Sequence, residues 1–224
     1  MKNQIVAIGD IHGCSETLKL MWKNLEPFRE YIHVFVGDYI DRGPDSKGVV
    51  DFLLKVRHER NCIFLRGNHE QMLLDSIYYK RRDHWIMNGG KATLDSYDNV
   101  ELAEEMPEDH LEFYKNTLIY YDTDHYFFVH AGAPPYQSIA QSIKDPEAES
   151  YFLWGRDHLN ALEVKWEKTV IFGHTPRAFP IRKSKMIGID TGCVYNDVGM
   201  NKLTALILPD EHFIEQKTTD KLLS

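Results

Sequence analysis

Short apolar runs alternate with helical stripes over the first third of the chain, and this alternation restricts the fold more than any other feature. Apolar positions spaced at i, i+3, i+4 and i+7 fill the intervals between the runs, as expected of amphipathic helices. Two successive β-α-β units predict parallel strands joined by right-handed crossovers. The expected strands are QIVAI (4–8), IHVFV (32–36) and CIFLR (62–66), and the stripes are Leu18, Met21, Trp22 and Leu25, then Val49, Phe52, Leu53 and Val56.

The middle of the chain has a different texture, because helical patterns prevail from about Gln71 to Asn116. Strand-like runs then resume and continue almost to the end of the chain. We therefore predict one α/β domain over residues 1–224, with a helical insertion at about 71–116. The later runs are TLIYY (117–121), YFFVH (126–130), TVIFG (169–173), MIGID (186–190), LTALIL (203–208) and HFIEQ (212–216).

Composition excludes several classes of protein. The formal charge of −8, from 34 acidic and 26 basic residues, argues against a nucleic-acid binder, which usually presents a basic face. No stretch approaches the roughly 18 uninterrupted apolar residues of a membrane span, and Met1–Gly9 lacks the apolar core of a signal peptide. Three widely spaced cysteines do not form a disulfide framework, so we expect a reducing, cytoplasmic location.

Polar, glycine-rich motifs follow the predicted strands at their C-terminal ends. In open α/β sheets, functional sites form outside the carboxyl ends of the strands, so these loops should converge. The glycines allow sharp turns and a close approach of the backbone to a bound group. The motifs are GDIHG (9–13), GDYIDRG (37–43), RGNHE (66–70), HAG (130–132), GHT (173–175) and IDTG (189–192).

The converging residues predict a metal centre. Any one of them alone would usually be a solvated or turn-forming residue, but several such motifs, each after a strand, favour metal binding. Mixed oxygen and imidazole donors suit Mn, Fe or Zn better than Ca or Mg. The set exceeds what one tetrahedral ion needs, and two ions about 3.5–4 Å apart with a bridging carboxylate would use all of it. The predicted ligands are Asp10, His12, Asp38, Asn68, His130 and His174.

The motifs also carry a family resemblance. GDIHG, GDYIDRG, RGNHE and GHT are similar to the signature blocks of the phosphoprotein phosphatase family of metallophosphoesterases, the PPP-type family of calcineurin and bacteriophage lambda protein phosphatase. The lambda-type bacterial branch looks closest, since RGNHEQM, HW followed by NGG (84–90), LWGR (153–156) and IFGHTP (171–176) also match. The resemblance implies a calcineurin-like β-sandwich of two mixed sheets flanked by helices.

The resemblance further implies a role for each matching residue. Asp10 and His12 would hold the first ion, Asp38 would bridge, and Asn68, His130 and His174 would hold the second. Two divalent ions, manganese first with iron or zinc as alternatives, would activate a water for in-line attack on phosphorus. Three arginines would bind the phosphate, and His69, oriented by Asp41, would protonate the leaving group. These arginines are Arg42, Arg66 and Arg156.

The expected function is hydrolysis of phosphoserine and phosphothreonine, with phosphotyrosine in addition, in a phosphorylated protein or peptide. The alternative substrate is a nucleotide such as diadenosine tetraphosphate, on which relatives with the same metal core act. A non-catalytic binding protein is a third reading, disfavoured because every ligand position is filled. A nucleotide pocket would need aromatic side chains facing the site, for which the sequence offers Tyr78, Tyr79, Trp85, Tyr136 and Trp154.

Overall fold

Two five-stranded sheets form the framework of the chain in a computed structural model that describes residues 4–98 and 100–222. The outermost residues of the predicted 1–224 domain therefore lie outside the described part. The first sheet has the order β10-β9-β1-β2-β3 and the second β4-β5-β6-β8-β7. The strands of the first sheet are β1 (Ile5–Ile8), β2 (Ile32–Phe35), β3 (Cys62–Phe64), β9 (Lys202–Leu208) and β10 (His212–Lys217).

Both sheets are mixed. The strands β1, β2 and β3 are parallel, as predicted, and β9 pairs antiparallel with β1. In the second sheet, β5, β6 and β8 are parallel, while β4 and β7 run antiparallel at the two edges. Its strands are β4 (Tyr120–Asp122), β5 (Tyr126–Val129), β6 (Thr169–Phe172), β7 (Ile181–Lys183) and β8 (Met186–Gly188). The strand β7 was not predicted from the sequence, and the run predicted for β4 began three residues too early.

The sheets pack face to face, and the alternation of side chains along β1 shows how. Ile5 and Ala7 belong to the apolar cluster between the sheets, together with Phe128 of β5 and Ile171 of β6. Val6 and Ile8 point the other way into a second cluster, against the helices that cover the first sheet. Because both faces are buried, the strand reads as a continuous apolar run rather than an alternating one.

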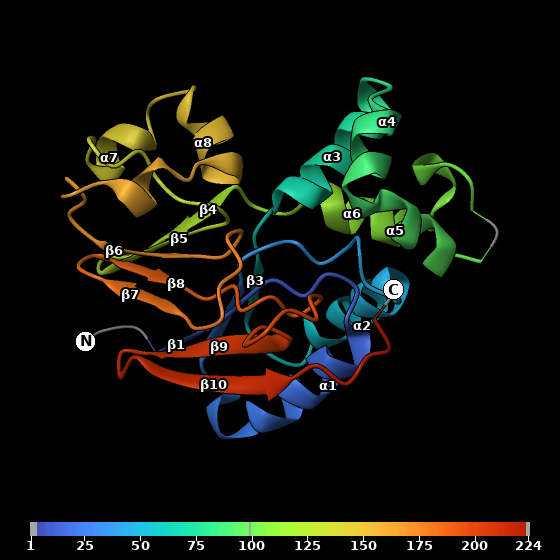
Figure 1. Cartoon of the computed structure of the whole chain (residues 1–224), viewed down its shortest axis with the longest axis horizontal. Helices are drawn as coiled ribbons and strands as arrows, with labels where there is room; N and C mark the ends of the chain where they lie inside the picture. Colours follow the sequence, from blue (N-terminus) through green and yellow to red (C-terminus); the bar gives the residue numbers. More distant parts are fainter. Residues whose placement is uncertain (1–3, 99, 223–224) are drawn as a thin grey trace.

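Helices cover the two outer faces of this sandwich (Figure 1). The first sheet packs against α1 (Ser15–Asn24) and α2 (Ser46–Val56), and Asp45, the N-cap of α2, accepts a hydrogen bond from the Gly48 amide. The second sheet packs against α7 (Ile139–Ser142) and α8 (Ala148–Trp154). The helices between β3 and β4 gather into a separate group (Figure 1), and they are α3 (Asn68–Tyr78), α4 (Arg82–Trp85), α5 (Lys91–Ser96) and α6 (Glu108–Lys115).

This arrangement brings the carboxyl ends of β1, β2, β5, β6 and β8 to one edge of the sandwich. The strand register shows that neighbouring parallel strands end together. Ile8 of β1 pairs with Phe35 of β2, and Phe172 of β6 pairs with Gly188 of β8. The loops after β1, β2, β5 and β6 carry five of the predicted metal ligands, and the sixth, Asn68, follows β3. Within the part of the chain that the structure describes, no helix is both long and apolar enough to cross a membrane.

Candidate metal centre

All six predicted metal ligands are buried and lie in one cluster, although they come from five separate loops. Asp38, which follows β2, stands at the centre. One of its carboxylate oxygens, Oδ2, lies 3.5 Å from Nε2 of His12, and the other, Oδ1, lies 3.3 Å from Nε2 of His130. The ligand atoms form two groups that share this residue, His12–Asp38–His69 and Asp38–His130–His174. A carboxylate placed in this way can bridge two cations.

The second group brings two imidazole nitrogens and an amide oxygen close to one another. Oδ1 of Asn68 lies 2.9 Å from Nε2 of His130 and 2.8 Å from Nδ1 of His174, and these two nitrogens are 3.2 Å apart. His130 uses its other nitrogen, Nδ1, toward the Val36 carbonyl 2.9 Å away. A carbonyl only accepts, so Nδ1 carries the proton and Nε2 presents its lone pair. Lone pairs converging at these distances fit a cation between them.

The first group has the same character. Nδ1 of His12 donates to the Ile40 carbonyl at 2.8 Å, which leaves the Nε2 lone pair facing Asp38. Asp10 accepts from the His174 amide through Oδ2 at 2.9 Å. Among the described residues, Asp10 Oδ1 and His174 Nε2 are buried atoms that have no hydrogen-bond partner. A buried carboxylate oxygen without a partner is costly, and a divalent cation would satisfy it.

The pKa shifts of the predicted ligands are consistent with cation binding. Burial lowers the pKa of His12 and of His174, so both imidazoles stay neutral and able to bind a cation. Burial raises the pKa of Asp10, and the nearby charges of Asp190 and Asp38 raise it further. Burial alone would also raise the pKa of Asp38, but the imidazoles of His130 and His69 have the larger effect, and the pKa of Asp38 is lowered. Crowded carboxylates of this kind need a compensating positive charge.

Backbone strain is concentrated in the same loops. His12, Asp38 and His174 have positive φ angles of 46°, 54° and 63°, in the left-handed region that side chains other than glycine rarely adopt. Asp41 and Arg42 follow with φ of 72° and 69°. Such strain costs of order 1–3 kcal/mol per residue and persists only where the surroundings fix the conformation, as at functional sites.

The predicted acid pair is present. Nδ1 of His69 lies 2.6 Å from Oδ2 of Asp41, and both side chains are almost completely buried. On its other side, Nε2 of His69 lies 4.0 Å from Oδ2 of Asp38 and so faces the metal ligands. Burial would lower the pKa of His69, but Asp38 and Asp41 outweigh it and raise it, which favours the protonated imidazole that a general acid needs.

The three predicted arginines lie in different environments. Nη1 of Arg42 donates to Nε2 of His12 at 3.0 Å, at the centre itself, and there a cation would compete for the same lone pair. Arg156 is exposed, and its Nη2 lies 3.4 Å from the His174 carbonyl. Arg66 instead hydrogen-bonds Thr117 and Gln71 and the carbonyl of Lys115 at the C-terminal end of α6. The structure therefore brings two of the three to the centre.

Two carboxylates at the site were missed by the sequence analysis. Glu70, to which no role was assigned from the sequence, accepts hydrogen bonds from the amides of Asp38, Tyr39 and Gly67 at 2.8–2.9 Å. Asp190, after β8, is buried, and its burial and the charge of Asp38 raise its pKa to about 6. Its position after a strand, in IDTG, was the available signal. Glu70 gave none, because its partners are backbone groups.

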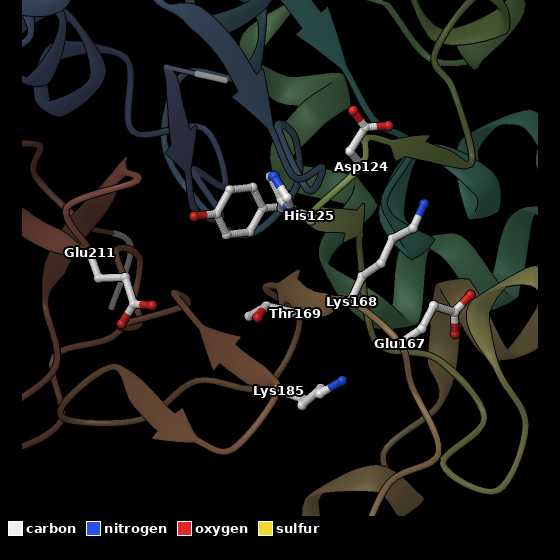
Figure 2. Close-up of a pocket in the computed structure, with 8 residues that line it drawn as sticks. Asp124, His125, Glu167, Lys168, Thr169, Lys185 and Glu211 are labelled. Carbon is white, nitrogen blue, oxygen red and sulfur yellow. The ribbon is translucent and has the colours of Figure 1, made fainter. Parts of the chain in front are cut away.

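The pocket shown in Figure 2 is a different place on the molecule. Asp124 and His125 precede β5, Lys168 and Thr169 lie at the start of β6, and Lys185 precedes β8. It is thus at the amino ends of these parallel strands, whereas the metal ligands follow their carboxyl ends. It shares no residue with the ligand set, and its charged lining consists of three carboxylates and two lysines.

Comparisons with known proteins agree with this geometry. The chain is 28% identical over 240 residues to the bis(5'-nucleosyl)-tetraphosphatase PrpE [asymmetrical] of Oceanobacillus iheyensis, covering 94% of this chain and 91% of the relative. It is 44% identical to serine/threonine-protein phosphatase 1 of Salmonella typhimurium, but over 85 residues only, 37% of each chain. The solved structure of a protein provisionally assigned as a diadenosine tetraphosphatase superposes with a TM-score of 0.68 and 22% identity, covering 96% of this chain and 93% of that one.

A family model also matches most of the chain. The sequence model described as calcineurin-like phosphoesterase matches residues 4–178, which include all six predicted metal ligands. The two mixed sheets flanked by helices are the fold that the sequence analysis expected. This chain therefore belongs to the calcineurin-like phosphoesterase family.

Proposed function

We propose that the protein hydrolyses dinucleoside polyphosphates, with diadenosine tetraphosphate as the representative substrate. The observation that carries this proposal is how far each similarity extends. The similarity to the tetraphosphatase PrpE covers 94% of the chain, including the helices between β3 and β4 and the loops after β5 that lie around the centre. The similarity to the serine/threonine phosphatase covers 37%. The phosphoprotein substrate expected from the motifs becomes the second candidate, supported by the higher 44% identity of that shorter match.

The cluster is proposed to hold two divalent cations, with manganese first and iron or zinc as alternatives, because the donors mix imidazole nitrogens with carboxylate and amide oxygens. Asp10 and His12 would hold one ion, Asn68, His130 and His174 the other, and Asp38 both. When bound, the ions supply Lewis-acid polarisation of the phosphoryl group and lower the proton affinity of a water in their field.

The chain's own side chains account for substrate binding and proton transfer. Arg42 and Arg156 are proposed to hold phosphoryl oxygens, since a guanidinium can donate to two oxygens at once. His69 is proposed to give its Nε2 proton to the leaving oxygen while Nδ1 stays bonded to Asp41. Arg66 is not included among the phosphate ligands, because its hydrogen bonds go to α3 and to the end of α6.

An aromatic side chain beside the centre supports a nucleotide substrate. The ring of Trp154, at the end of α8, lies 6.1 Å from the ring of His174 and 6.3 Å from that of His84. Trp154 is 36% exposed, whereas Trp22, Trp85 and Trp166 are at most 7% exposed. Nucleobases stack on exposed aromatic rings with about 1–3 kcal/mol per base. Trp154 therefore becomes the proposed contact for one base.

The decisive experiment compares two substrates on one preparation. Protein reconstituted with manganese would be assayed in parallel on diadenosine tetraphosphate and on phosphoserine and phosphothreonine peptides, with Asp38→Asn as the inactive control. We expect a higher kcat/KM on the dinucleotide. A strong preference for the phosphopeptides would overturn the proposal, and turnover of neither substrate with manganese, iron or zinc would favour a binding protein.

The base contact can be tested on the same preparation. Trp154→Ala should raise KM for the dinucleotide by about 5- to 150-fold, the equivalent of about 1–3 kcal/mol of stacking, and Trp154→Phe should restore most of the affinity. The KM for a phosphopeptide should change much less. A nucleotide that stacks on Trp154 should also quench the intrinsic fluorescence, since the other three tryptophans are buried. Equal quenching of wild type and Trp154→Phe would contradict the assignment.

A further inference from the structure

The carboxylate of Asp41 is completely enclosed, and most of its partners come from helices far along the chain. Oδ1 accepts from the Thr93 hydroxyl at 2.6 Å, and the Trp85 indole N–H lies 3.0 Å from both carboxylate oxygens. Oδ2 completes the set with His69 at 2.6 Å. Trp85 ends α4 and Thr93 lies in α5, so both belong to the helices between β3 and β4.

The hydroxyl of Thr93 takes part in three hydrogen bonds, and its single proton fixes the direction of each. Its single proton goes to the Asp41 carboxylate, because the carboxylate can only accept. Its oxygen then accepts from the Asp41 amide at 2.9 Å and lies 3.0 Å from the Ser46 hydroxyl, which must be the donor of that pair. Thr93 thus holds both the backbone and the side chain of Asp41.

The turn between Trp85 and Thr93 holds the next residue of the same loop. The amide of Arg42 donates to the Gly89 carbonyl at 3.2 Å. A Cβ on Gly89, whose φ is 108°, would come within 2.7 Å of Arg42 Cγ, and a Cβ on Gly90 would lie about 2.6 Å from the Trp85 ring. The two glycines therefore let this turn pack directly against both Arg42 and the indole. Together these contacts hold Asp41 and Arg42, two of the residues with left-handed backbone.

We infer that residues 85–93 form a positioning clamp for the acid and phosphate-binding residues of the site. Trp85 and Thr93 fix the plane of the Asp41 carboxylate, so that His69 can approach Oδ2 only with Nε2 directed toward the centre. Gly89 fixes the backbone of Arg42. Trp85 and Thr93 are positioning residues that act through Asp41 and do not touch the substrate. The inference rests on the proposed roles of His69 and Arg42 and adds to them a purpose for this part of the helices between β3 and β4.

The test uses variants that remove one hydrogen bond each. Thr93→Val deletes the hydroxyl at nearly constant shape, Thr93→Ser keeps it, and Trp85→Phe deletes the indole N–H. Trp166→Phe is the matched control, because Trp166 is equally buried and donates to the Pro134 carbonyl at 2.8 Å, in a different apolar cluster. Each variant would be assayed with manganese on p-nitrophenyl phosphate, which has a good leaving group, and on glycerol 2-phosphate, which has a poor one.

We expect Thr93→Val and Trp85→Phe to lower kcat on glycerol 2-phosphate on the order of 10-fold, with a clearly smaller loss on p-nitrophenyl phosphate. A poor leaving group needs the proton from His69, and a good one does not. Thr93→Ser should behave as wild type, and Trp166→Phe should change both substrates by the same factor. If Thr93→Val changed both substrates equally, the clamp would be a packing feature alone, and the inference would fail.

A second measurement does not depend on hydrolysis. In metal-free protein, the Nδ1 proton of His69 in its 2.6 Å hydrogen bond should give a far-downfield proton NMR signal, identified by its loss in His69→Asn. Thr93→Val should shift this signal, and Thr93→Ser should restore its position. An unchanged signal would overturn the clamp even in an active enzyme. A shifted signal in a protein without activity toward any phosphate would keep the clamp while the proposed function failed.

Discussion

Replacing Arg66 with lysine would decide whether this side chain binds phosphate, as its motif suggests, or holds the end of α6, as its contacts suggest. The guanidinium donates through Nε to Thr117 at 3.0 Å, through Nη1 to Gln71 at 3.2 Å and through Nη2 to the Lys115 carbonyl at 2.9 Å. Its positive charge also lies at the negative end of the α6 dipole, which adds to the stabilisation. A lysine keeps the charge but can reach only some of these hydrogen-bond acceptors.

The magnitude follows from the bonds that are lost. Hydrogen bonds from a charged donor contribute about 1.5–3 kcal/mol each, and lysine should lose about two of the three. Arg66 is only partly buried, so water replaces some of the loss, and the expected decrease in the free energy of unfolding is about 2–3 kcal/mol. For a chain of this length, that lowers Tm by roughly 4–12 °C.

The assay compares unfolding with kinetics in the same variants. Urea unfolding of metal-free Arg66→Lys should show the lower stability, while KM for the substrate measured well below Tm changes little. Arg42→Lys is the contrasting variant, because Arg42 contacts His12 and should affect KM far more than stability. The reasoning would be refuted if Arg66→Lys unfolded within about 0.5 kcal/mol of wild type and raised KM as strongly as Arg42→Lys.

Three further predictions concern the centre and its surroundings. His69→Asn should leave the metal content measured by elemental analysis unchanged and slow alkyl phosphates more than aryl ones; equal losses would argue against a general acid. Manganese at 100 times its Kd should raise the free energy of unfolding by about 2.7 kcal/mol per site. Calorimetry should find that Asp38→Asn loses more manganese binding than His174→Ala, because Asp38 contacts both groups of ligands. Burial lowers the pKa of His158 to about 4, so the free energy of unfolding falls as pH drops from about 6.5 toward 4. Between pH 7.5 and 5, urea unfolding of wild type should lose about 2 kcal/mol more than that of His158→Phe. Parallel losses in the two proteins would exclude this cause.

The metal ligands could be predicted from sequence because of a simple geometric rule. Parallel strands that share a sheet end at the same edge, so a polar residue directly after each strand meets its counterparts whatever the distance along the chain. His130 and His174 are 44 residues apart and still lie 3.2 Å from each other, since β5 and β6 pair in parallel. The helices of the first third were equally predictable, because their apolar stripes have the spacing of a helix and Asp45 provides the N-cap.

The partners of Asp41 could not be predicted in the same way. Thr93 lies 52 residues away and Trp85 lies 44 residues away, and neither directly follows a strand. A hydrogen bond between such positions leaves no periodicity or spacing in the sequence. The edge strand β7 was missed for a related reason, since its three residues are partly or fully exposed and form no apolar run. Arg66 shows the converse, because its motif position suggests phosphate and only its contacts reveal the helix end.

The GNHE motif shows why so few residues can organise so much of the site. Gly67 has to be a glycine, because a Cβ there would overlap the backbone and carboxylate of Asp38. Asn68 faces the two histidines, His69 faces Asp41, and Glu70 accepts the amides of Asp38 and Tyr39. The bonds of Glu70 use backbone groups and leave the ligand atoms of Asp38 free. The strained, left-handed conformation of Asp38 is therefore held by hydrogen bonds of the protein itself, and its two carboxylate oxygens are divided between the two groups of ligands.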